Sequence, residues 1–82
     1  MFFKVIHNKE VHIYNPKGPT TLVGLNAYIK SAFKAVPQKY HLEYEDIEND
    51  LVTLAGQDDF EMMIETSNKI VKIFIRENNE DF

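Results

Sequence analysis

The spacing of apolar residues along the chain predicts five β-strands and two helices. Stretches in which apolar and polar residues alternate, or in which β-branched residues dominate, are typical of strands. The predicted strands are residues 2–7, 11–14, 41–45, 51–54 and 70–75. Apolar residues at steps of three and four are typical of helices packed on one side. These stripes are Leu22, Leu25, Ile29, Ala32, Phe33 and Val36 in the first helix, and Phe60, Met63 and Ile64 in the second.

Capping and breaking residues indicate where the two helices begin and end. Thr20 or Thr21 can cap the first helix, because a hydroxyl oxygen accepts hydrogen bonds from the free N–H groups of the first turn. Pro37 ends this helix, since proline disfavours helical geometry at the preceding residue. Asp58 and Asp59 begin the second helix, where negative charge is favourable.

The first two strands are predicted to form a hairpin whose register follows from the residues that face the core. That set is Phe3, Val5, Val11 and Ile13. The loop then consists of residues 8–10, because the alternation of side chains ties the register to the face that is buried. Lys4 is expected on the outer face of the sheet, opposite Tyr14.

The order of elements is β-β-α-β-β-α-β, which predicts an α+β fold with two helices on one face of a mixed sheet. This order is that of the ubiquitin-like β-grasp. The last strand is expected in the centre, because it is apolar through most of its length. Eighty-two residues suffice for one domain. We assign residues 1–76 to the domain and 77–82 to a polar tail.

Charge is distributed unevenly along the chain, although the net charge is only −4. Residues 1–39 contain six Lys and one Glu, whereas residues 40–68 contain nine Asp or Glu and no Lys or Arg. An acidic total of this kind argues against nucleic-acid binding, which needs a continuous basic surface. Carboxylates gathered so densely repel one another unless water, helix ends or a basic partner compensates them. The pattern therefore predicts an acidic docking surface for a protein.

Composition narrows the class of protein further. The apolar runs are too short for a transmembrane helix, and the N-terminus lacks the features of a signal peptide. The sequence has no cysteine, which removes disulfides, thiolate metal sites and thiol nucleophiles. We expect a cytoplasmic protein with no membrane or nucleic-acid partner.

Residues 44–64 resemble the acidic OPCA motif of the Phox/Bem-one interaction domains. The matching positions are Tyr44, Asp46, Glu48, Asp50, Val52 and Leu54 in the first half, and Asp59, Phe60 and Ile64 in the second. Asn49 replaces the glycine of the turn, which is tolerable because Asn accepts left-handed backbone angles. Ala55 and Gly56 replace a small polar pair before the helix, so a side-chain cap is expected to be missing. Gln57 stands where an acid is common.

The resemblance implies a domain that docks its acidic face on a lysine of a partner Phox/Bem-one domain of basic or mixed type. That face is Asp46, Glu48, Asp50, Asp58 and Asp59. One partner lysine is expected to lie between the two acidic clusters. Lys4 stands where the family's basic type presents its lysine, which implies a mixed type that can also join copies head to tail. The resemblance implies a signalling scaffold rather than an enzyme, with no cofactor.

The sequence allows three other interpretations to be compared with docking. Calcium binding at Asp46, Glu48 and Asp50 fails, because neither the glycine nor the glutamate of an EF-hand loop is present at the required position. A ubiquitin-like adaptor that binds through apolar sheet residues such as Phe2 and Ile6 stays open, as does a small enzyme. Binding through an apolar face would resist added salt, whereas binding through the acidic face would weaken.

Overall fold

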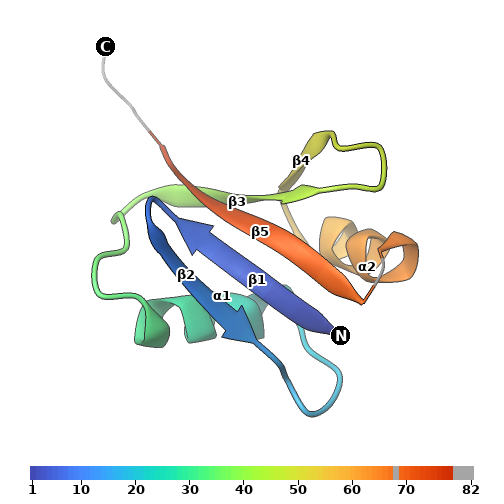
Figure 1. Ribbon diagram of the computed structural model, residues 1–82, viewed down its shortest axis with the longest axis horizontal. Helices are drawn as coiled ribbons and strands as arrows, with labels where there is room; N and C mark the ends of the chain where they lie inside the picture. The colour runs from blue at the N-terminus through green and yellow to red at the C-terminus, as the bar shows by residue number, and fades with distance from the viewer. Residues whose placement is uncertain (68, 79–82) are drawn as a thin grey trace.

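A single five-stranded sheet with two helices on one face forms the protein (Figure 1). The computed structural model describes residues 1–67 and 69–78. The elements are β1 (Phe2–His7), β2 (Glu10–Tyr14), α1 (Leu22–Ala32), β3 (Tyr40–Glu45), β4 (Leu51–Leu54), α2 (Gln57–Thr66) and β5 (Ile70–Glu77). The predicted α+β class and the β-grasp order are confirmed.

The strand order in the sheet is β2-β1-β5-β3-β4. β5 lies in the centre, as predicted, parallel to β1 and antiparallel to β3. The two hairpins, β1–β2 and β3–β4, therefore lie on either side of the last strand, and each brings its outer strand to one edge of the sheet. This arrangement places the acidic β3–β4 connection and the strand that carries Lys4 on opposite sides of β5.

The core fills the space between the helices and one face of the sheet. Alternate residues of β1, β3 and β5 are buried there, which is the pattern expected of a sheet covered on one side. The helices contribute Leu25, Ile29, Phe60 and Met63 to the same cluster. No polar or charged residue is buried within the described part of the chain. The charged side chains of the sheet consequently gather on its open face or at its ends.

The predicted register of the first hairpin is wrong by one residue. Lys4 pairs with Ile13 rather than Tyr14, and the loop contains only Asn8 and Lys9. Asn8 has a φ of 55°, a left-handed conformation that allows so short a connection. A shift of one residue moves every side chain of the strand to the other face. Ile13 is therefore on the open face, 55% exposed, together with Val11.

Aromatic packing on α1 explains why this register is favoured. The rings of Tyr14 and Tyr28 stack with centroids 4.3 Å apart, and the His12 ring meets Phe33 edge-on at 4.5 Å. The Tyr28 hydroxyl also donates to the carbonyl oxygen of Ile13 at 3.2 Å. Large rings cover more core surface than two aliphatic side chains. Lys4 keeps its predicted outward position, because Phe3 and Val5 are buried in either register.

The helix ends differ slightly from the predicted ones. Thr21 caps α1, its hydroxyl accepting from the N–H of Gly24 at 3.0 Å. α1 ends at Ala32, earlier than predicted, because Phe33 turns to extended backbone and buries its ring. Gly56 precedes α2 without a side-chain cap, as predicted.

The last strand is longer than predicted, since β5 continues through Arg76 to Glu77. The predicted polar tail begins at Glu77, which belongs to this strand. Residues 79–82 of that tail lie outside the described residues.

Candidate functional site

The first acidic cluster lies in the turn between β3 and β4, and Asp46 organises it. Its Oδ1 atom accepts hydrogen bonds from the N–H groups of Glu48 and Asp50, both at 2.9 Å. Its own N–H donates to the carbonyl oxygen of Asp50 at 2.9 Å, which closes the turn. Asn49 completes the turn with a φ of 65°, the left-handed conformation predicted for this position. Asp46 therefore shapes the turn, while Glu48 and Asp50 point their carboxylates to solvent.

The second acidic cluster lies in the first turn of α2. Here too, one carboxylate accepts an internal hydrogen bond and another is exposed to solvent. Asp59 Oδ2 accepts a hydrogen bond at 2.9 Å from the N–H of Ala55, just before the helix. This bond ties the residue before Gly56 to the first turn of the helix, and the free N–H groups of that turn have no side-chain cap. Asp58 is exposed and forms no hydrogen bond or ion pair with any described residue.

The two acidic clusters lie at opposite ends of β4. Asp50 directly precedes this strand, whereas α2 begins after it, at Gln57. Four residues of strand span on the order of 10 Å, at about 3.3 Å per residue. That one partner lysine lies between the two acidic clusters stays a prediction.

The open face of the sheet carries a row of five side chains that crosses all the strands. In sheet order these residues are Ile13, Lys4, Lys72, Glu45 and Leu51. Lys4 is paired directly with Lys72 on β5, and Lys72 Nζ lies 3.7 Å from Glu45 Oε1. Lys4 itself forms no ion pair within residues 1–67 and 69–78. The row is apolar at its two ends, basic at Lys4 and Lys72, and acidic at Glu45.

Lys72 was missed by the sequence interpretation. Its signal in the sequence is weak: a single charged residue within the apolar strand 70–75. Its importance comes from its neighbours, because a parallel pairing brings it beside Lys4 from the far end of the chain.

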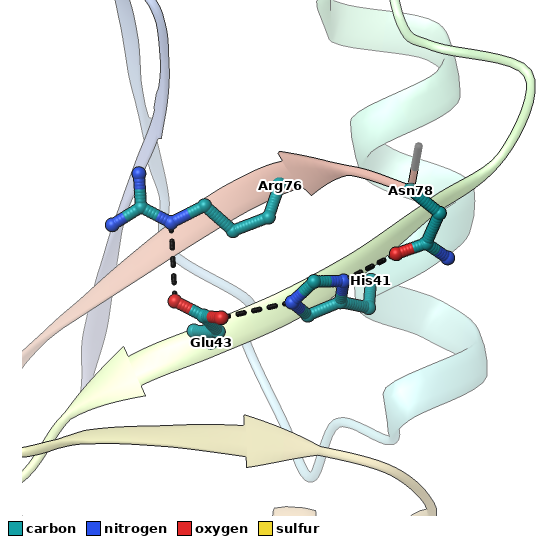
Figure 2. A network of polar contacts seen from close by, with 4 residues as sticks. All are labelled: His41, Glu43, Arg76 and Asn78. Atoms are coloured by element: carbon teal, nitrogen blue, oxygen red, sulfur yellow. Dashed lines mark hydrogen bonds and ion pairs between the residues drawn. The ribbon is translucent and has the colours of Figure 1, made fainter. Parts of the chain in front are cut away.

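A second set of charges on the open face is neutralised internally (Figure 2). Glu43 accepts from Arg76 Nε at 3.1 Å and contacts His41 Nε2 at 2.8 Å, while His41 Nδ1 lies 2.5 Å from Asn78 Oδ1. The hydrogen bond from His41, with Arg76 nearby, lowers the pKa of Glu43. The hydrogen bonds to Asn78 and Glu43 raise the pKa of His41. These side chains bind β3 to β5 and are less available to a partner.

Metal sites and membrane spans are the two remaining kinds of feature. No group of three or more His, Asp or Glu side chains in the described ranges is arranged to hold a metal ion. None of the described helices is long and apolar enough to cross a membrane.

Comparison with known families identifies the fold that carries these charges. The family model described as the PB1 domain matches residues 1–78 of the chain. The chain belongs to the PB1 domain family. The resemblance to Phox/Bem-one domains is thereby confirmed, since PB1 is the short name of that family. A search of curated proteins returned no match.

The charged residues of this PB1 domain fall into two groups. In the first group the carboxylate accepts hydrogen bonds within the domain, as in Asp46, Asp59 and Glu43. A second group of charged side chains has no internal partner among the described residues, and it includes Lys4, Glu48, Asp50 and Asp58. Lys4 lies on β1, whereas the three acids lie before and after β4.

Proposed function

We propose that this PB1 domain docks the acidic side chains around β4 on the basic open face of another PB1 domain, and that Lys4 lets copies join head to tail. Its membership of the PB1 family makes the chain a protein–protein interaction module. One observation carries the proposal. Lys4 on β1 and Asp50 before β4 have opposite charges, and neither side chain has an ion-pair partner among the described residues. Complementary charge increases the association rate and the selectivity between partners.

The separation of the two acidic clusters specifies the partner more closely. Glu48 and Asp50 lie before β4 and Asp58 lies after it, so the acidic surface offers carboxylates at two places. A partner that presents two basic groups on one sheet face can pair with the carboxylates at both places.

A head-to-tail contact uses different surfaces on the two copies, so it does not close on itself. Each added copy leaves one acidic and one basic surface free, and the assembly grows as an open chain unless geometry closes a ring. The number of copies should therefore rise with concentration. Salt should shorten the chains, because exposed charges are screened.

The test is the molar mass in solution over a wide concentration range, at low and high salt. Wild type is compared with Lys4→Ala and with the double variant Glu48→Gln/Asp50→Asn. Asp46 is kept, because its carboxylate organises the turn. Mass should grow with concentration for wild type alone, and salt should suppress the growth. Growth that persists in both variants would exclude these charges as the contact.

A second candidate function is an adaptor that binds through the apolar part of the open face. The register of the hairpin favours it, because Phe2, Val11 and Ile13 are 43%, 46% and 55% exposed on that face. Binding of this kind would resist salt and would be lost in Val11→Ser/Ile13→Ser. The salt titration of wild type separates the two functions.

A further inference from the structure

Lys72 stands between the two surfaces that head-to-tail docking would use. On one side it is paired across the sheet with Lys4. On the other its ammonium group lies 3.7 Å from Glu45, the residue that precedes Asp46 in the acidic turn. Lys72 and Glu45 also line a hollow of about 330 Å³ together with Asp46 and Ile47 of the turn.

We propose that Lys72 has opposite effects on the binding affinity of the two surfaces. On the basic surface it is a second cation beside Lys4 that attracts an acidic partner. On the acidic surface it competes with a partner's lysine for Glu45. The proposal rests on the head-to-tail docking described above. The basic surface consists of Lys4 and Lys72 together, flanked by the exposed Ile13. The partner that fits this surface is an acidic turn such as that of a second copy.

The pairing of Lys4 with Lys72 supports the role of Lys72 as a second cation of the basic surface. Like charges directly opposite each other in a sheet are destabilising. Glu45 compensates Lys72 from the far side, whereas Lys4 has no carboxylate partner among the described residues. An acidic side chain from another molecule would relieve this repulsion at both lysines. The Lys4–Lys72 pair thus presents two cations within reach of one acidic turn.

The contact between Lys72 and Glu45 supports the role of Lys72 as a competitor on the acidic surface. The ammonium group lies beside the turn that receives a partner's lysine, and it repels that lysine. The pair is weak and easily exchanged, because the Lys72 and Glu45 side chains are 51% and 30% exposed. A lysine that enters the hollow competes with Lys72 for Glu45. Removal of the Lys72 charge should therefore strengthen binding at the acidic surface.

The experiment uses two variants of the chain that each keep one surface. The lysine copy carries Glu48→Gln/Asp50→Asn and keeps Lys4. The acid copy carries Lys4→Ala and keeps the acidic turn. Mixed together, they should form a 1:1 complex whose dissociation constant is measured at low salt by analytical ultracentrifugation. Lys72→Met is then placed in one copy at a time, which removes the charge and keeps most of the side-chain volume.

The proposal predicts changes of opposite sign in the two copies. Lys72→Met in the lysine copy should weaken the complex about two- to fivefold, and in the acid copy it should strengthen it by a similar factor. Lys30→Met is the matched control, since Lys30 is exposed on α1, away from the open face. Lys72→Arg keeps the charge and should leave both constants nearly unchanged.

The outcomes separate the failure of this proposal from the failure of docking itself. If the complex forms but Lys72→Met changes it in the same direction in both copies, or no more than Lys30→Met does, the double role of Lys72 is wrong. If the two copies do not bind at all, head-to-tail docking is wrong, and the role of Lys72 falls with it. Thermal unfolding of each variant verifies that the fold is retained.

Discussion

The Asp46 carboxylate accepts a hydrogen bond at 2.9 Å from the backbone N–H of Asp50, so one acid of the turn holds the next in place. The same Oδ1 atom accepts from Glu48 at the same distance. Acidic residues that look alike in the sequence therefore have different roles. Asp46 gives the turn its shape, and Glu48 and Asp50 offer free charge.

This division predicts different effects of two single substitutions. Asp46→Ala removes the acceptor of two backbone N–H groups and should lower the free energy of unfolding by about 1–2 kcal/mol. Asp50→Ala removes an exposed carboxylate and should change it by less than about 0.5 kcal/mol. Urea unfolding followed by circular dichroism measures both. Equal effects would show that Asp46 has no special part in the turn.

Asn49 provides a second test of the same turn. Its φ of 65° is costly for a β-branched residue. Asn49→Val should therefore reduce stability by about 1–2 kcal/mol, whereas Asn49→Gly should be close to neutral. Thermal unfolding of the two variants gives the comparison. A valine variant as stable as the glycine variant would contradict the left-handed geometry.

The hairpin register can be tested by two substitutions in β2. Ile13 is on the open face, so Ile13→Thr should cost less than about 1 kcal/mol, even though isoleucine would be a core residue in the register predicted from the sequence. Tyr14→Ala should cost more than about 1.5 kcal/mol, because the Tyr14 ring stacks on Tyr28 and its centroid lies 5.9 Å from that of the Phe3 ring. Denaturant unfolding decides between the registers, since the predicted one reverses the order of the two costs.

The network around Glu43 predicts how stability depends on pH. The pKa of Glu43 is lowered in the fold, so its contribution is complete above the ordinary value of 4.5 and is lost as pH falls through the lowered value. The pKa of His41 is raised, so its contribution is complete below 6.5 and is lost as pH rises through the raised value. Both contributions are present together between 4.5 and 6.5.

The measurement is the stability difference between wild type and His41→Gln across the pH range. The difference should be largest between pH 4.5 and 6.5 and should shrink on either side. His7→Gln is a control, because His7 belongs to β1 and lies outside this network. A difference that is constant with pH would show that the His41 charge contributes nothing.

The separation of the acidic clusters predicts additive effects on docking. Asp50→Asn and Asp58→Asn should each weaken binding to a basic PB1 partner, and the double variant should show the sum of the two free-energy changes. Sites without shared partners behave in this way. Binding titrations of the single and double variants measure the changes. A double variant no weaker than either single one would indicate one shared lysine.

The local pattern of apolar and polar residues was sufficient to predict the helices and strands and the outward position of Lys4 on the sheet. Alternation within β1 buries Phe3 and Val5, so Lys4 must point outward whichever register β2 takes. The apolar run of β5 likewise predicts a central strand, and β5 does lie in the centre of the sheet, although only its alternate residues are buried. These features can be predicted from the sequence, because they depend on the pattern of apolar and polar residues within one short segment.

Tertiary structure decided which charges meet. The register of β2 depends on rings that pack on α1, and the Lys4–Lys72 pair joins strands that lie at opposite ends of the chain. The sequence shows Asp46 and Asp50 as equal members of an acidic run, and only the folded turn makes one of them an acceptor of backbone hydrogen bonds. The sequence by itself determined the strands, the helices and the outward position of Lys4, because these follow from local periodicity. The tertiary structure decided the partners of each charge, because contacts between distant segments depend on how whole elements pack.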